Sequence, residues 1–141
     1  MAPVPKKIII VEDEPDTAEM FAEMIRLNGY RVIKSYGGRA AVDTIIEIRP
    51  AAVVLDIMMP GLSGIDVLGI IRQDPQLAKI PVIIVSARGL PSDIRSGIEA
   101  GAFMYLTKPV AYSDLKQAIV AALGEDDIVE DWESETDELE E

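Results

Sequence analysis

The sequence predicts an α/β fold in which five parallel strands are covered by helices on both faces. Short apolar runs alternate with longer segments of helical period along the first 124 residues. Three of the five runs are continuously apolar and rich in β-branched residues, which is typical of strands buried on both faces. A chain of 141 residues with 49% hydrophobic residues suits one domain. The expected arrangement is a flavodoxin-like three-layer sandwich with strand order 2-1-3-4-5.

The five expected strands share a short apolar centre, and they are residues 7–11, 30–35, 51–55, 80–85 and 103–106. The second is the weakest, with only Val32 and Ile33 at its centre. Apolar residues at helical spacing mark the helices between them: Met20, Phe21, Met24 and Ile25; Ala41, Val42, Ile45 and Ile46; Val67, Leu68 and Ile71; Ile94 and Ile98; Leu115, Ala118, Ile119 and Ala122.

Start and stop signals bound several of these helices. Pro15 and Asp16 open the first, residues 28–29 (Asn-Gly) close it, and the second ends before Pro50. Ser113 is the expected N-cap of the fifth helix.

The fourth helix, at about residues 92–100, has a thin apolar stripe and an internal Gly97. A glycine inside a helix costs roughly 1 kcal/mol relative to alanine. We therefore expect this helix to be the most loosely held of the five.

Two residue types are absent, and their absence restricts the chemistry. The chain has no cysteine and no histidine, which excludes disulfides, thiolate nucleophiles, Cys- or His-ligated metals and imidazole catalysis. No apolar run approaches the length of a membrane span, and no signal peptide follows the first lysines. A cytoplasmic protein is expected.

The net charge of −12 is concentrated at one end of the chain. Residues 125–141 hold eleven acidic residues and no basic one, so the rest of the chain is nearly neutral. Neither part has the basic patch that nucleic-acid binding requires. We expect residues 1–5 to be a short extension, 6–124 the folded domain and 125–141 a disordered acidic tail. The alternative for the tail is a docking segment formed by Ile128, Val129, Trp132 and Leu139.

Polar residues fall where four of the apolar runs end. Glu12 and Asp13 follow the first run, Asp56 the third, Ser86 the fourth, and residues 107–109 (Thr-Lys-Pro) the fifth. An open α/β fold places its site at the carboxyl ends of the strands, so these residues are expected to meet there.

Three converging carboxylates repel one another, and a hard divalent cation such as Mg²⁺ relieves that repulsion. Lys108 adds a compact positive charge and Ser86 a hydrogen-bond donor. Such a group suits a carboxylate, Asp56, that accepts a phosphoryl group.

Four segments at these strand ends resemble the signature segments of response-regulator receiver domains of the stand-alone, CheY-like type. They are residues 11–15 (VEDEP), 54–61 (VLDIMMPG), 85–87 (VSA) and 106–109 (LTKP), and the resemblance runs from about residue 6 to 124.

The resemblance implies that Asp56 is the phospho-acceptor and that Mg²⁺, or another hard divalent cation such as Mn²⁺, binds Glu12, Asp13, Asp56 and the backbone carbonyl of Met58. It implies that Ser86 reorients toward the phosphoryl group, that Lys108 binds it, and that Tyr105 is the aromatic switch. It also implies a cis peptide bond between Lys108 and Pro109.

The leading functional hypothesis is a non-enzymatic two-component switch. A histidine kinase or histidine phosphotransfer protein donates the phosphoryl group, since this chain has no histidine. Output is expected through protein–protein contacts, with a homodimer on phosphorylation as one form. The expected surface comprises the fourth helix, fifth strand and fifth helix, around Arg95, Glu99, Tyr105, Tyr112 and Lys116.

Two alternatives belong to other classes. One is a receiver-like scaffold that binds partners without phosphorylation, which the complete set of charged site residues disfavours. The other is an aspartyl-phosphate phosphatase, whose general acid lies two residues after the nucleophile; here that position is Met58, which cannot transfer protons. Met58 and Arg88 are expected to flank the path of an attacking water. Because methionine cannot orient water, a long-lived phosphoaspartate is expected.

Overall fold

The structure is a computed structural model that describes residues 4–124. Residues 1–3 and the acidic segment 125–141 lie outside the described residues, as do the expectations of disorder or docking made for that segment. No helix in the described part is long and apolar enough to span a bilayer.

Five parallel strands form one sheet in the order β2-β1-β3-β4-β5, which confirms the predicted fold class. The strands are β1 (Lys7–Val11), β2 (Arg31–Ser35), β3 (Ala52–Asp56), β4 (Val82–Ser86) and β5 (Met104–Thr107). Asp56 and Ser86 are thus the last residues of β3 and β4, whereas the sequence pattern placed each of them directly after its strand. Asp56 pairs with Val85, and Ser86 pairs with Thr107.

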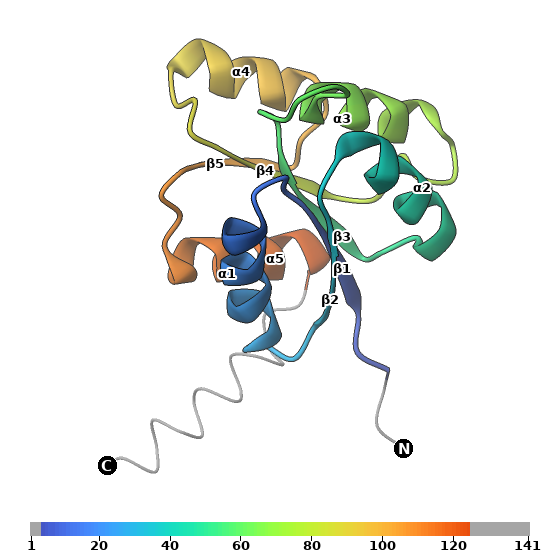
Figure 1. Cartoon of the computed structure of the whole chain (residues 1–141), viewed down its shortest axis with the longest axis vertical. Coiled ribbons are helices and arrows are strands. Elements are labelled where there is room, and N and C mark those ends of the chain that lie inside the picture. Colours follow the sequence, from blue (N-terminus) through green and yellow to red (C-terminus); the bar gives the residue numbers. More distant parts are fainter. Residues whose placement is uncertain (1–3, 125–141) are drawn as a thin grey trace.

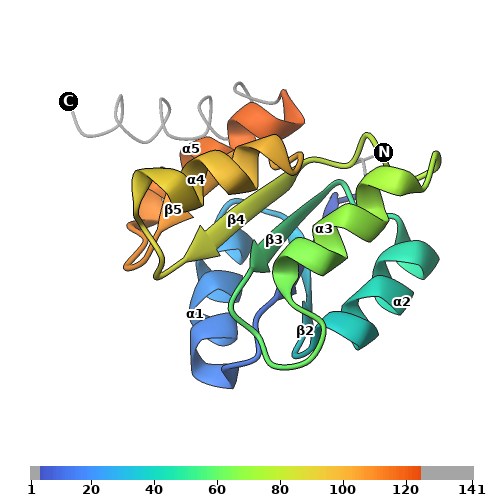
Figure 2. The ribbon, with the colours of Figure 1, turned by 90° about the horizontal axis from the view of Figure 1, so that it is seen from above.

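Helices cover both faces of the sheet, as Figure 1 shows. They are α1 (Pro15–Arg26), α2 (Gly38–Ile48), α3 (Gly64–Gln73), α4 (Pro91–Glu99) and α5 (Tyr112–Leu123). One apolar core lies between the sheet and α1 and α5, and a second lies between the sheet and α2 and α3. Figure 2 shows β3 running between α1 on one side and α3 on the other.

Three local expectations need correction. Ser113 lies inside α5 rather than at its N-cap, which is Ala111 and has no side-chain cap. Met20 and Ile46 are exposed, because the buried stripe of α1 runs through Ala18 and Ala22 as well as the predicted Phe21 and Ile25, and that of α2 through Gly38 as well as the predicted Ala41 and Ile45. A helix that packs closely against a sheet favours such small residues on its inner face.

Gly64 is the first residue of α3. A Cβ at this position would lie 2.5 Å from the backbone oxygen of Asp56 and 2.5 Å from the Cα of Ile57. Only glycine therefore allows α3 to start directly against the end of β3. Gly61, with φ +76, is the turn residue of this connection.

Arg72 joins three loop carbonyls on the α2/α3 side of the molecule. Its Nε donates to the oxygen of Gly101 at 2.9 Å, and one Nη donates to Ala78 and Ile80 at 3.0 and 2.8 Å. Burial lowers the pKa of Arg72. The guanidinium thus links the segment before β4 to the turn before β5.

The fourth helix has a single buried residue, Gly97. A Cβ on Gly97 would lie 2.8 Å from Cδ2 of Tyr105 and 3.0 Å from Cδ1 of Ile84. The glycine that weakens the isolated helix therefore lets α4 approach the tyrosine ring of β5.

Candidate functional site

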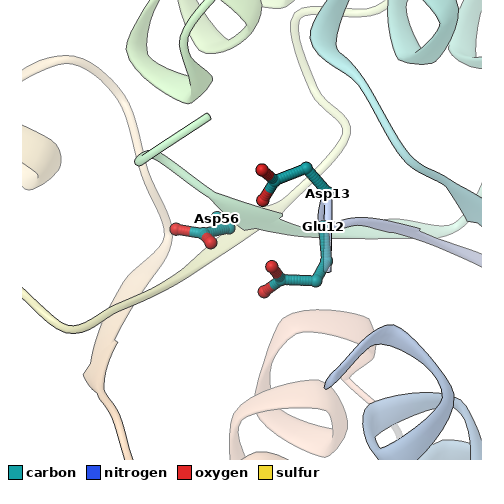
Figure 3. A group of neighbouring side chains, drawn as sticks. All are labelled: Glu12, Asp13 and Asp56. Carbon is teal, nitrogen blue, oxygen red and sulfur yellow. The ribbon is translucent and has the colours of Figure 1, made fainter. Parts of the chain in front are cut away.

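Three carboxylates converge at the carboxyl edge of the sheet. Glu12 and Asp13 follow β1 directly, and Asp56 ends β3, which is the neighbouring strand. Figure 3 shows the carboxyl groups of Glu12 and Asp13 extending from the end of β1 toward the side of Asp56. One oxygen from each of the three lies within 4.8 Å of the others. The convergence expected from the strand-end positions is present.

Asp56 is held in a fixed orientation. Asp56 is only 4% exposed, and each of its carboxylate oxygens accepts a hydrogen bond. Oδ1 accepts the backbone N–H of Met58 at 2.9 Å, and Oδ2 accepts Nζ of Lys108 at 3.2 Å. The carboxylate is thus oriented by the loop that follows β3 and by the lysine that follows β5.

Lys108 bridges two acids. Its Nζ lies 2.8 Å from Oε1 of Glu12 as well as 3.2 Å from Asp56. Loss of solvent by itself lowers the pKa of Lys108, but the hydrogen bond to Glu12 and the charge of Asp56 outweigh it, so the net pKa is raised. The lysine therefore stays charged between the two carboxylates. The peptide bond from Lys108 to Pro109 is cis.

Glu12 is 2% exposed, and burial raises its pKa. The hydrogen bond from Lys108 lowers the pKa of Glu12, while the negative charge of Asp56 raises it again. The other carboxylate oxygen, Oε2, accepts the N–H of Glu14 at 3.2 Å. Glu12 is thus a buried acid whose charge depends on its neighbours, whereas Asp13 beside it is exposed.

A chain of contacts leads from the site to α4. Ser86 is fully buried, and its Oγ accepts the N–H of Arg88 at 3.1 Å. The carbonyl of Arg88 accepts the hydroxyl of Tyr105 at 2.5 Å. The ring of Tyr105 lies against Gly97 of α4. The loop between β4 and α4 thus connects the serine of the site with the tyrosine of β5.

The side chains of Met58 and Arg88 lie differently. Met58 is 51% exposed at the site. The guanidinium of Arg88 pairs with Asp93, in the first turn of α4, at 3.4 Å. Arg88 is therefore engaged with α4, which its position in the sequence did not indicate.

The donor set fits a hard divalent cation. Three carboxylate oxygens in one small space, two of them in buried residues, carry more negative charge than Lys108 alone balances. Oxygen ligands of this kind are those that Mg²⁺ takes, usually together with water.

Comparison with known proteins identifies this arrangement. Residues 8–120 match the family model described as the response regulator receiver domain. The chain belongs to the response regulator receiver family. The receiver is 32% identical over 122 residues to the polar-differentiation response regulator DivK of Brucella anthropi, covering 86% of this chain and 99% of that protein.

Some relatives are longer, and some are domains of histidine kinases. The chain is 37% identical over 120 residues to response regulator MprA of Mycolicibacterium vanbaalenii, covering 85% of this chain and 51% of that protein. It spans about half the length of several further curated relatives. The receiver domain of sensor histidine kinase PA1611 from Pseudomonas aeruginosa PAO1 has a TM-score of 0.79 and 29% identity, covering 86% of this chain and 99% of that domain. That structure has a magnesium ion coordinated in its active-site cleft.

Sequence reasoning missed two supporting residues of the receiver site. Gly64 permits the close contact of α3 with the backbone of Asp56, and Glu14 caps α1 by accepting the N–H groups of Asp16 and Thr17. The sequence shows both residues beside the motifs. Their roles depend on a close approach of backbones and on a side-chain rotamer, and neither follows from spacing.

Proposed function

We propose that this receiver is a phosphoryl-accepting two-component switch and that Asp56 is its acceptor. One observation carries the proposal: Asp56 is a buried carboxylate with one oxygen held by Met58 and the other by Lys108, next to two further acids. A carboxylate in this setting is oriented for attack, and its surroundings favour neutralising an incoming phosphoryl group.

The transfer proceeds from a phosphohistidine on a histidine kinase or phosphotransfer protein. A carboxylate oxygen of Asp56 forms a bond to phosphorus while the P–N bond of the donor breaks. The electron pair of that bond returns to the imidazole, which takes up a proton. Lys108 then lies near a phosphoryl oxygen and offsets its charge, as it offsets the charge of Asp56 here.

Glu12, Asp13 and Asp56 are the residues that would hold Mg²⁺, with the carbonyl of Met58 as a further ligand. The ion would neutralise charge on the phosphoryl oxygens during transfer. Because Glu12 is held by Lys108 and by the N–H of Glu14, its longer side chain is pre-oriented toward the shared space.

Phosphorylation changes the hydrogen bonds that connect Ser86, through Arg88, with Tyr105 and α4. Ser86 turns toward a phosphoryl oxygen, which removes the acceptor of the Arg88 N–H and loosens the carbonyl that holds Tyr105. Tyr105 and α4 then shift together, and the face of α4, β5 and α5 binds a protein partner or a second copy of the chain. This face includes Arg95, Glu99, Tyr105, Tyr112 and Lys116.

Intact-mass spectrometry after incubation with acetyl phosphate tests the proposal. Wild type should gain one phosphoryl group when Mg²⁺ is present and none when EDTA removes it. Asp56→Asn should gain none. Asp43→Asn, an equal change at an exposed position of α2, should behave as wild type.

Labelling that persists in Asp56→Asn would show a different acceptor. No labelling of wild type with acetyl phosphate or with a phosphorylated phosphotransfer protein would favour the phosphorylation-independent scaffold.

A further inference from the structure

The amino edge of the sheet, opposite the carboxylate site, carries several cations. Lys7 and Arg31 begin β1 and β2, Arg49 follows α2, and Lys79 lies shortly before β4. Arg31, Arg49 and Lys79 are exposed, and Lys7 is half-buried. These four residues are called the basic edge below.

The pairing register places two of these cations on one face. Lys7 and Arg31 are direct partners in the parallel pair of β1 and β2, so their side chains point the same way. Side chains alternate along a strand, so Lys7 shares its face with Ile9, and Arg31 shares its face with Ile33. Ile9 and Ile33 both pack in the core on the α2/α3 side.

The other two cations belong to the same side. Arg49 is the C-cap of α2, and its guanidinium is hydrogen-bonded to the side chain of Gln76. Gln76 and Lys79 both lie in the segment between α3 and β4. The basic edge therefore runs along the α2/α3 side from β2 toward β4.

Within residues 4–124, no carboxylate forms an ion pair with Lys7, Arg31 or Lys79. The side chain of Arg49 donates a hydrogen bond to a neutral amide, that of Gln76. The acids near this edge include Glu47 in the last turn of α2, Asp74 at the C-cap of α3 and, toward β5, Glu99 at the end of α4. Asp74 already accepts the N–H of Gln76 at 2.9 Å. A positive excess remains along the edge.

The opposite edge has the reverse balance. Glu12, Asp13 and Asp56 gather there, and the nearby cations Lys108 and Arg88 are already paired with carboxylates. An anionic segment is therefore repelled from the phosphoryl-accepting edge and attracted to the basic edge.

The chain contains such an anionic segment, and it follows α5, which ends near the amino edge of the sheet. Residues 125–141 include eleven acids and no base. A helix that follows a parallel strand runs back toward the amino edge, and Figure 2 shows α5 running opposite to the β4 arrow up to its cap at Gly124. Seventeen further residues can extend up to roughly 55–60 Å, far more than is needed to cross the sheet to its α2/α3 side.

We propose that the acidic segment 125–141 binds the basic edge of its own domain as an intramolecular electrostatic latch. Each contact is an exposed ion pair and is weak by itself, but attachment to α5 keeps the segment at high effective concentration. The latch leaves the carboxylate edge accessible to a phosphodonor. It also covers the basic edge against other anionic partners, and high salt releases it.

Trp132 makes the latch measurable because it is the only tryptophan of the chain and lies in the acidic segment. Its collisional quenching by neutral acrylamide is compared between the full chain and a synthetic peptide of residues 125–141. At low salt the full chain should show a quenching constant at least two-fold below that of the peptide. At 0.5 M NaCl the two values should converge.

Variants at the two ends of one helix provide matched controls. Arg49→Glu, alone and with Lys79→Glu, should raise the quenching constant at low salt toward the peptide value. Arg39→Glu makes the same charge change at the exposed start of α2 and should leave it at the wild-type value. Circular dichroism verifies that each variant is folded. In wild type, carbodiimide cross-linking should join carboxylates of residues 125–141 to Lys7 or Lys79.

Several results would overturn the latch. These are equal quenching of full chain and peptide at low salt, equal effects of Arg39→Glu and Arg49→Glu, and shielding that persists in 0.5 M NaCl. Shielding that disappears on dilution would assign the segment to a second copy of the chain, and that too would refute an intramolecular contact.

Discussion

Replacing Arg72 with methionine should lower the free energy of unfolding by about 3 kcal/mol. The guanidinium makes three hydrogen bonds, to Gly101, Ala78 and Ile80, and methionine keeps the stem but none of the donors. A bond of this kind contributes about 1 kcal/mol net when the freed carbonyl can partly rehydrate, and these contacts are only partly buried. For a domain of this size the loss corresponds to a fall in Tm of roughly 10 °C.

Urea unfolding followed by far-UV circular dichroism measures this effect, because the signal comes from the helices and strands that the structure describes. Arg39→Met is the matched control, because Arg39 is exposed and should change the stability by less than about 0.5 kcal/mol. Arg72→Lys should fall between the two, since an ammonium cannot reproduce the planar fork. A loss for Arg72→Met no larger than that of the Arg39 control would refute the assignment of Arg72 as a link between the loops.

Three further changes test the site and its connection to α4. Gly97→Ala should destabilise the domain by about 1–3 kcal/mol in urea unfolding, because the new methyl group overlaps the Tyr105 ring; Tyr105→Ala in the same chain should recover part of the loss if that overlap is the cause. Met58→Asn should shorten the lifetime of the phosphorylated protein, followed by intact mass after removal of acetyl phosphate, and an unchanged lifetime would refute a role for this side chain in excluding a positioned water. Lys108→Met should lower Tm without added metal, because it leaves the buried carboxylate of Glu12 beside another acid, and Mg²⁺ should raise Tm more in the variant than in wild type; an equal response would contradict charge balance by the lysine.

The sequence predicted the fold class and the convergence of the site because both depend on periodicity. Apolar runs identify the strands, and the carboxyl ends of parallel strands necessarily meet, so Glu12, Asp13 and Asp56 could be brought together from spacing. The proximity of Lys108 also follows from its place after the fifth strand.

Contacts that depend on exact packing could not be predicted in the same way. Ser113 looks like a helix cap, but the helix starts one residue before it and the N-cap residue, Ala111, makes no side-chain cap hydrogen bond. In the sequence, Gly64 looks like a turn glycine and Gly97 like a glycine that only destabilises its helix. Their packing roles become visible only from the atoms that a Cβ at each position would approach. The partners of Arg72 are carbonyls, which carry no signature in the sequence.

The single buried residue of α4 has a thermodynamic consequence. Because that residue is a glycine, detaching α4 from the sheet exposes little apolar surface of the helix itself and uncovers only a few side chains of the sheet, such as Ile84 and Tyr105. Opening of this helix should therefore have a small heat-capacity change and a small denaturant dependence compared with global unfolding. Amide hydrogen exchange in α4 should then change little between 0 and 1 M urea or with moderate warming, while the strands respond strongly. The position of α4 can thus be set by a few polar contacts, such as the ion pair of Arg88 with Asp93, while most of the two apolar cores stays packed.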